Sequence, residues 1–369
     1  MPRSRRTPPT ADLRQRPPAE VQYAEELARL QAADADPRPP GWRLSPPAVR
    51  RFVLGDEGLA VERKFVGDGA LVDRAMVSLA TNRGLMLVGE PGTAKSLLSE
   101  LLAAAISGRS TLTIQGSAAT AEEQIKYGWN YALLLAEGPS TRALVPGPLY
   151  VGMRDGQVVR FEEVTRCPLE VQDALLGPLS DRVLAVPELG EEGLLYARQG
   201  FNVIATANTR DLGVNEMSAA LKRRFAFETV FPIRDYDTEL ALVRAQARKE
   251  LDRSGVPELP SPEVLELLVT TFRELRSGQT LDGQALERPS TAMSTAEAVG
   301  VAHAVGVRAH FLNRRAATPE DLVHCLVGAA TKADDADVAL LRRYFEQRVG
   351  KRREPHWKAY FQARHALPA

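Results

Sequence analysis

The residues whose types and spacing most clearly indicate a chemical function form one stretch, GEPGTAKS, at positions 89–96. Its frame matches G-x-x-x-x-G-K-[ST], a loop whose backbone amides and following helix N-terminus hold phosphate groups. In that frame Lys95 would reach the β- and γ-phosphates of a nucleotide, and the hydroxyl of Ser96 would ligate Mg²⁺. The stretch follows a strand-like apolar run and precedes a helical pattern, as such a loop requires. The predicted nucleotide-binding residues are Gly89, Glu90, Pro91, Gly92, Thr93, Ala94, Lys95, Ser96 and Leu97.

Ala94 stands where the frame has its second glycine, whose small size lets the backbone approach a phosphate. A helical φ at this position would accept alanine at little cost, whereas a positive φ would add about 1–2 kcal/mol of strain. Because the residue directly precedes the predicted helix, we expect the helical value and a working loop.

Further polar residues supply what hydrolysis of a nucleotide needs. Glu162 and Glu163 follow the apolar run QVVRF. The first is the candidate Mg²⁺ ligand, directly or through water, and the second is the candidate general base. The strand FNVIATAN ends in Asn208, which would sense the γ-phosphate, because ligands of parallel sheets bind at the carboxyl ends of strands. Arg224, with Arg223 as second choice, could act as an arginine finger on a neighbouring subunit, which implies a ring or at least a dimer.

A sheet and its helices must position these residues. Short apolar runs predict strands at 84–89, 110–116, 157–161 and 201–208, and helical spacing predicts helices at 71–82, 96–108 and 168–182. This alternation indicates an α/β domain with a parallel sheet between helices. After about Pro232 only helical patterns follow. The predicted organisation is a flexible Arg/Pro-rich arm with one helix and a connector (1–60), an α/β nucleotide-binding domain (61–232), an all-helical lid (233–350) and a C-terminal tail (351–369).

Composition narrows the classes of function. The chain has 369 residues, 44% of them hydrophobic and 25% charged, with 47 basic and 47 acidic residues. It therefore lacks the positive excess typical of nucleic-acid-binding proteins. Its apolar runs are shorter than the roughly 18 residues of a membrane helix, and the N-terminus has no secretory signal pattern. Cys167 and Cys325 form no disulfide framework or zinc pattern. We expect a cytoplasmic protein.

GEPGTAKS, FEEVTR, IATANTRD and ALKRRF, in this order and before a helical region, resemble the motifs of the MoxR group of AAA+ ATPases, in the helix-2-insert branch. The segment 144–182, with its Pro-Gly-Pro element and V-Q-x-A-L helix, carries the most specific likeness. The resemblance covers about residues 60–345. It implies a P-loop NTPase core, ATP and Mg²⁺ as ligands, ATP hydrolysis, a hexameric homo-oligomer and chaperone-like remodelling of protein partners, often with a von Willebrand factor A-domain protein. It also implies an insertion between 116 and Pro146 and a hairpin at 183–200.

Two positions depart from the pattern of this group. The first acid is Glu162 rather than Asp, one methylene longer. The lid of the group offers a sensor arginine in a pattern like S-P-R, but here the stretch reads RPSTAMS, with Ala292 at the matching position. Arg288, four residues earlier, is the candidate replacement that would contact the nucleotide.

Two other functions stay open, the first because of these departures and the second because related AAA+ branches include helicase and nuclease-associated rings. One is an assembly switch that binds ATP, oligomerises and hydrolyses slowly. The other is a nucleic-acid motor, which the neutral charge argues against and which only the Arg-rich arm and KRREPHWK (351–358) support.

Overall fold

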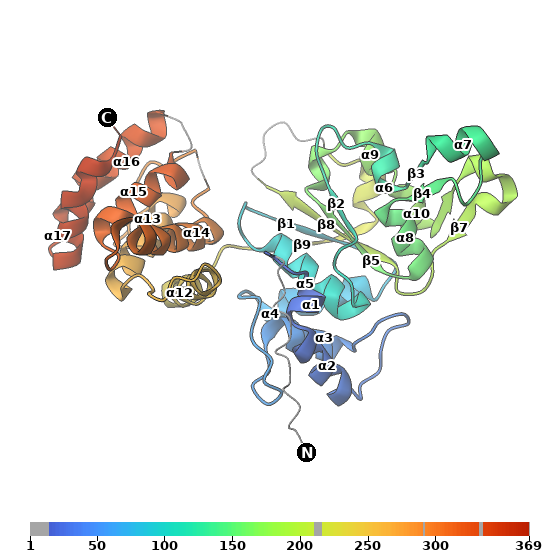
Figure 1. The fold of residues 1–369 in the computed structure, drawn as a ribbon, viewed down its shortest axis with the longest axis horizontal. Coiled ribbons are helices and arrows are strands. Elements are labelled where there is room, and N and C mark those ends of the chain that lie inside the picture. The colour runs from blue at the N-terminus through green and yellow to red at the C-terminus, as the bar shows by residue number, and fades with distance from the viewer. Residues whose placement is uncertain (1–14, 210–215, 291, 332–334, 369) are drawn as a thin grey trace, which may run out of the picture. The chain divides into compact units, whose positions relative to one another are not determined.

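The computed structural model describes residues 15–209, 216–290, 292–331 and 335–368. These residues form two compact units by their internal contacts. Residues up to 88, 96–207 and 216–229 belong to the first unit, and 89–95, 208–209 and 230 onwards belong to the second. The first holds most of a central sheet, and the second holds the C-terminal helices (Figure 1).

A five-stranded sheet runs in the spatial order β2-β5-β8-β1-β9 (Figure 1). The pairs β1–β9, β2–β5 and β5–β8 are parallel, so the carboxyl ends of these strands meet at one edge. The sequence prediction missed the edge strand β9, because its apolar run FAF is only three residues long before Glu228. The strands are β1 (Gly84–Gly89), β2 (Thr113–Gln115), β5 (Val158–Glu162), β8 (Asn202–Asn208) and β9 (Phe225–Thr229).

Helices pack on this sheet, among them α4 (Gly69–Leu79), which contacts β9, and α8 (Pro148–Asp155), which contacts β5. Helix α5 (Lys95–Ser107) follows the phosphate loop, and its run of leucines and alanines from 101 to 105 is buried. The helix predicted at 168–182 is divided into α9 (Leu169–Asp173) and α10 (Leu176–Ser180). Pro178 explains the break, because a proline ring clashes with the carbonyl four residues earlier and donates no hydrogen bond.

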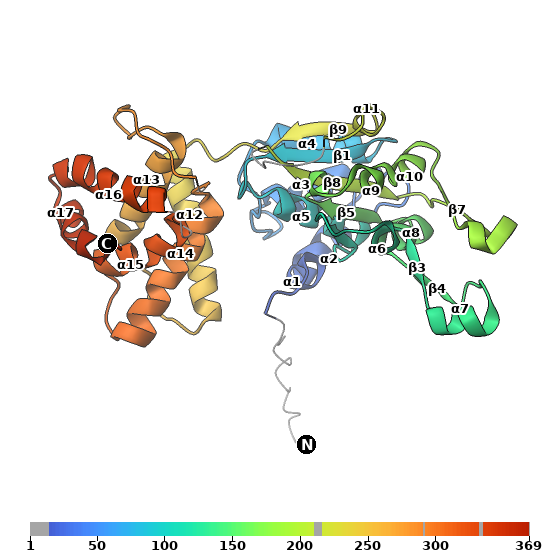
Figure 2. The same cartoon turned by 90° about the horizontal axis from the view of Figure 1, so that it is seen from above.

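Two small antiparallel pairs lie where the family resemblance implied an insertion and a hairpin. Before Pro146 the chain forms α6 (Glu122–Ile125), β3 (Tyr127–Trp129), α7 (Tyr131–Glu137) and β4 (Leu144–Pro146), with β3 paired to β4. Strands β6 (Val183–Ala185) and β7 (Leu194–Tyr196) pair in the same way. Figure 2 shows α7 and its flanking strands projecting from the body of the sheet.

The predicted arm with one helix and a connector (1–60) is incomplete for residues 15–60. These residues form α1 (Ala19–Gln22), α2 (Ala24–Ala33) and α3 (Pro46–Leu54). Helices α1 and α2 lie where a helix was expected, but α3 was not predicted. Val49, Phe52 and Val53 of α3 are fully buried, and apolar burial of this kind orders a short segment. A signal was present, since Ser45 followed by two prolines is a typical helix start and its hydroxyl caps α3. The rest of the predicted arm, 1–14, lies outside the described residues.

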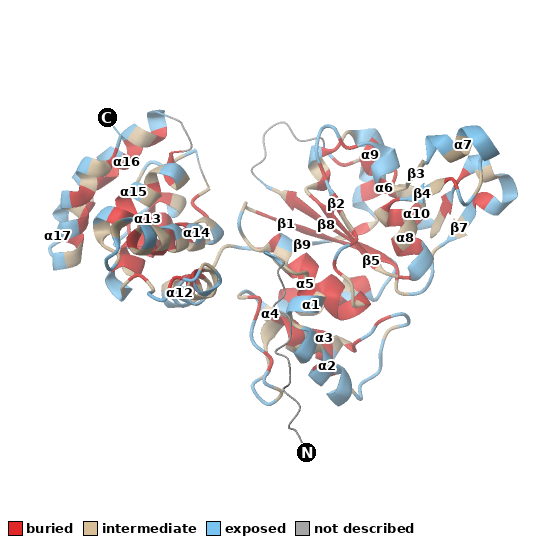
Figure 3. Ribbon diagram, in the orientation of Figure 1, coloured by how far each residue is buried: buried red, intermediate tan, exposed pale blue. Residues whose placement is uncertain are grey.

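The second unit is a bundle with one apolar core. The predicted tail at 351–369 is wrong as far as 368, because Trp357 and Tyr360 of the last long helix are buried in that core. Figure 3 shows the same pattern of buried inner faces and exposed outer faces on the helices. The helices are α12 (Tyr236–Arg253), α13 (Pro262–Ser277), α14 (Thr295–Val307), α15 (Pro319–Ala330), α16 (Asp335–Gln347) and α17 (Pro355–Gln362).

No helix in the described ranges combines the length and apolar character needed to cross a membrane.

Candidate nucleotide-binding site

The ends of three adjacent strands bring the predicted site residues to one edge of the sheet. Strand β8 lies between β5 and β1, so Glu162, Asn208 and Gly89 terminate neighbouring strands. The backbone amide of Thr209, next to Asn208, donates to the carbonyl of Gly89 at 3.1 Å. The sequence prediction that these residues share an edge therefore agrees with the strand order.

In the phosphate loop between β1 and α5, the side chain of Lys95 hydrogen-bonds to carbonyl groups of the same loop. The Nζ of Lys95, which is 6% exposed, donates to the carbonyls of Gly89 at 3.0 Å and Glu90 at 2.7 Å. The Thr93 hydroxyl also donates to Glu90, at 2.9 Å. Gly92 has a φ of +75°, a value that glycine adopts without strain. The loop thus holds the ammonium group of Lys95 at the helix N-terminus, where anions bind.

Ala94 adopts a φ of +66°, so the expectation of a helical value is wrong. Helix α5 begins one residue later, at Lys95, and the residue before it must turn the chain out of the loop. A left-handed conformation costs an alanine about 1–2 kcal/mol. The glycine of the general frame would fit here without this cost, and the chain carries the strain at the loop.

Replacing Ala94 with glycine should stabilise the protein by about 0.5–1 kcal/mol, because the relief of strain exceeds the added flexibility of the unfolded chain. Chemical denaturation without nucleotide measures this change as a higher midpoint at constant slope. Ala80→Gly is the matched control and should be destabilising, because Ala80 has a right-handed φ of −79°. A lower midpoint for Ala94→Gly would contradict the strain argument.

Four donors surround the carboxylate of Glu162. Its Oε2 accepts from the hydroxyls of Ser96 at 2.7 Å and Thr206 at 2.8 Å. Its Oε1 accepts from the hydroxyl of Ser99 at 2.6 Å and from Nη2 of Arg160 at 2.8 Å. Burial alone would raise the pKa of Glu162, but the charge of Arg160 and the three hydroxyl donors outweigh it and lower the pKa. The group is therefore an ionised carboxylate at neutral pH, hydrogen-bonded to the predicted Mg²⁺ ligand Ser96.

The side chain of Glu163 has other partners than the four donors around Glu162, which together form the Glu162 cradle. Its backbone has a φ of +55°, and its amide donates to the Thr206 hydroxyl at 3.0 Å. Its Oε2 accepts from Nε2 of Gln115 at 3.3 Å and pairs with Nη1 of Arg166 at 3.1 Å. The side chain is 30% exposed, so its carboxylate reaches solvent, as a base that activates water requires. Sequence reasoning missed Gln115, although its place at the carboxyl end of β2 was available as a signal.

Arg224 lies at the opposite edge of the sheet. Its carbonyl accepts from the amide of Gly84, the first residue of β1, at 2.9 Å. Its Nε donates to the hydroxyl of Ser180 at 2.6 Å. With a rise of about 3.3 Å per residue, β1 separates this edge from Gly89 by roughly 16 Å. Arg224 is thus remote from the phosphate loop of its own chain. The adjacent Arg223 is exposed.

In the second unit, Arg288 is engaged within the bundle. Its Nη2 donates to the carbonyl of Ser277, the last residue of α13, at 2.7 Å. The contact fastens the connection between α13 and α14 and lends no support to a nucleotide-sensing role. Ala292, at the position of the sensor arginine, offers no charged group.

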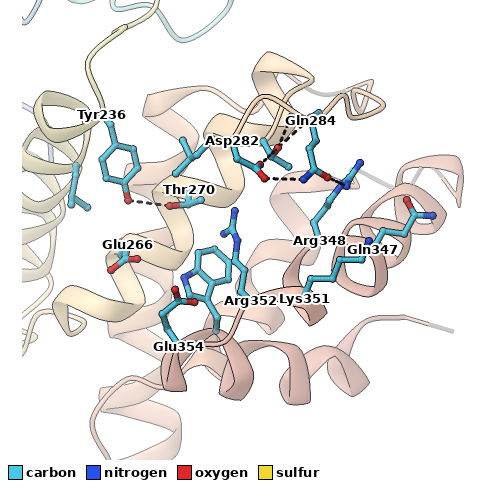
Figure 4. A pocket seen from close by; sticks show the side chains of 14 residues that line it. Tyr236, Glu266, Thr270, Asp282, Gln284, Gln347, Arg348, Lys351, Arg352 and Glu354 are labelled. Carbon is cyan, nitrogen blue, oxygen red and sulfur yellow. Dashed lines mark hydrogen bonds between the residues drawn. The ribbon is translucent and has the colours of Figure 1, made fainter.

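The described helices also enclose a pocket of about 510 Å³ (Figure 4). None of the predicted site residues lines it. Some of its polar groups pair with one another, as in the contact of the Tyr236 hydroxyl with Thr270 at 3.0 Å. Arg352 lies 3.7 Å over the ring of Trp357 and pairs with Glu274 at 2.5 Å. This arginine of the KRREPHWK run therefore serves packing, which weakens one of the two supports for a nucleic-acid motor.

Comparisons with known proteins cover both units. The family described as "AAA domain (dynein-related subfamily)" matches residues 84–225, and the family described as "YehL-like AAA+ ATPase C-terminal domain" matches residues 237–368. The chain is 64% identical to the uncharacterized protein YehL of Escherichia coli (strain K12) over 355 residues, which cover 96% of this chain and 98% of that protein.

More distant likenesses are confined to parts of the chain or to the fold. An uncharacterized protein of Staphylococcus haemolyticus (strain JCSC1435) is 28% identical over 43% of this chain and 59% of its own length. A crystal structure of NtrX from Brucella abortus in complex with ADP has a TM-score of 0.50 at 17% identity, covering 82% of this chain and 64% of that chain. At such identity the likeness concerns the fold.

Proposed function

This chain belongs to the YehL-like family of AAA+ ATPases, and we propose that it hydrolyses ATP within a homo-oligomeric ring and uses the energy to remodel a protein partner. The observation that carries the proposal is the convergence, at one sheet edge, of a phosphate loop, a buried carboxylate on its serine and a second, solvent-reaching carboxylate. These are the parts that phosphoryl transfer to water needs.

Magnesium would be held by Ser96 together with phosphate oxygens of the nucleotide. Within the described ranges, no group of three or more His, Cys, Asp or Glu side chains is arranged to hold a metal. The Ser96 hydroxyl and the ionised Glu162 are oxygen groups of the kind that Mg²⁺ prefers. The four hydrogen bonds to Glu162 use its lone-pair positions, which favours an indirect role through Ser96. When bound, the ion would neutralise charge on the phosphates.

Glu163 and Asn208 would act on the attacking water. We assign Glu163 the role of general base, because its carboxylate follows the cation-site acid by one residue and reaches solvent. Gln115 and Arg166 hold that carboxylate at the edge. Asn208 ends β8, which lies between the strand of Glu162 and the strand of the phosphate loop. From there its amide would contact the γ-phosphate.

The position of Arg224 supports an oligomer. An arginine about one strand length from its own phosphate loop serves a nucleotide only in a neighbouring subunit. A ring gives every site such a neighbour. The hexameric ring size, the remodelling activity and a von Willebrand factor A-domain partner rest on the MoxR-group resemblance and stay predictions. The cytoplasmic location rests on the composition and also stays a prediction.

Two observations keep the slow assembly switch as the second candidate. The bundle presents no sensor arginine at position 292, and Arg288 is engaged with Ser277. A site with weak coupling of the helical unit to the γ-phosphate would bind ATP and assemble while turning over slowly.

Replacing Lys95 with alanine should abolish nucleotide binding, since the buried amine is the charge that the loop offers to the β- and γ-phosphates. Titration of a fluorescent ATP analogue measures this directly. Lys126→Ala removes a lysine that pairs with Glu122 on α6 and should bind like the wild type. Equal affinity in the Lys95 and Lys126 variants would remove the phosphate-loop assignment.

A further inference from the structure

We propose that Arg160 is a positioning residue of the nucleotide site, which fixes Glu162 beneath the first turn of α5 and thereby sets the dependence of nucleotide binding on Mg²⁺. This inference rests on the proposed function, since it concerns the same site. The starting observation is a charged residue in the middle of β5, where all five residues are buried. Arg160 is 9% exposed, and burial of a charge is costly unless it is paired and hydrogen-bonded.

The guanidinium of Arg160 finds an acceptor for each of its five N–H groups. Its Nε donates to the Ser99 hydroxyl at 2.9 Å, and Nη1 contacts the carbonyl of Ser110 at 3.2 Å and the hydroxyl of Thr113 at 3.4 Å. Its Nη2 donates to the carbonyl of Ser96 at 3.0 Å and to Oε1 of Glu162 at 2.8 Å. A guanidinium has five donors in a fixed fork, so this site uses the whole group.

These contacts tie three elements together around the predicted cation site. Ser96 and Ser99 belong to the first turns of α5, Thr113 begins β2, and Glu162 ends β5. Arg160 and Glu162 lie two residues apart on one strand, so their side chains share a face. Arg160 thus holds the backbone of the residue whose hydroxyl would ligate Mg²⁺ and the carboxylate that accepts from that hydroxyl.

The arrangement also accounts for glutamate at position 162. An aspartate is one methylene shorter, and its carboxylate would lie further from the donors on α5. With glutamate, the side chain is longer and has one more rotatable bond. Hydrogen bonds from Arg160 and Ser99 fix the position of its Oε1. Groups that orient the ligands of a metal typically change metal affinity or activity by 10–100-fold when they are removed.

The test uses the full chain and a fluorescent ATP analogue, titrated first with EDTA and then with increasing Mg²⁺. For Arg160→Met we expect the Mg²⁺ concentration at half-maximal enhancement of binding to rise by about 10-fold or more, with Mg²⁺-free affinity within about twofold of the wild type. Arg160→Lys keeps the charge with fewer donors and should give an intermediate shift. In a Glu162→Gln background, Arg160→Met should add little, because the two residues act as a unit.

Arg182→Met is the matched control, since Arg182 is a half-buried arginine of the same unit that donates to the carbonyls of Phe201 and Asn82. It should leave the Mg²⁺ dependence unchanged. If Arg160→Met does not fold, Arg160→Lys and Ser99→Ala carry the test, and each should shift the Mg²⁺ dependence. Wild-type Mg²⁺ dependence in the folded Arg160 and Ser99 variants would overturn the inference. A wild-type chain that binds no nucleotide would instead overturn the proposed function.

Discussion

Replacing Arg224 with alanine should leave ATP binding intact and reduce ATP hydrolysis by roughly 10³-fold or more. Arg224 directly precedes β9, whose first residue Phe225 pairs with the first residue of β1, while the phosphate loop begins at the last residue of β1. Its loss should therefore leave the site of its own chain undisturbed, and in the proposed ring it would remove a positive charge from the site of a neighbour. Steady-state phosphate release and binding of a fluorescent ATP analogue, measured on the same preparation, separate the two effects.

A mixing experiment shows whether this arginine acts between subunits. Arg224→Ala chains retain an intact Glu163, and Glu163→Gln chains retain an intact Arg224, so mixed assemblies contain some complete sites. We expect each variant alone to be nearly inactive and the mixture to regain activity. Arg223→Ala is the neighbouring control and should have the smaller effect. Full activity of Arg224→Ala, or a mixture as inactive as its parts, would exclude the trans role of Arg224.

Replacing Glu163 with glutamine should reduce hydrolysis by roughly 10²–10⁴-fold, because the amide keeps the shape of the side chain but cannot accept a proton from water. Nucleotide binding and ATP-driven assembly should persist, since Lys95, Ser96 and the Glu162 cradle are unchanged. Phosphate release and light scattering after size-exclusion chromatography measure both properties. Glu170→Gln, on the exposed side of α9, is the matched control and should hydrolyse ATP at the wild-type rate.

The site was predictable from the sequence where it depends on strand ends. Glu162 follows the mainly apolar run QVVRF, and Asn208 ends the mainly apolar run FNVIATAN. The parallel sheet brings such strand ends together. The edge strand β9 offers only three apolar residues in a row, so it was not predicted, although Arg224 directly precedes it. Helix α3 was not predicted, because its segment is rich in proline, although two prolines at the start of a helix are compatible with it.

Local conformation and long-range pairing were beyond the sequence pattern. The positive φ of Ala94 depends on where α5 begins, and a shift of one residue reverses the expectation. The role of Arg160 was not predicted, because its acceptors come from segments up to 64 residues away in the chain. Only the folded chain brings α5 against β5 and gives Arg160 these contacts.

The central claim is that this chain hydrolyses ATP, and phosphate release by the purified full-length wild type tests it most directly. With saturating ATP and Mg²⁺, the account predicts sustained turnover in the wild type and its loss in Glu163→Gln, while ATP still drives assembly of both. A wild-type rate as low as that of Glu163→Gln, with ATP-driven assembly intact, would contradict the claim and identify the protein as an assembly switch.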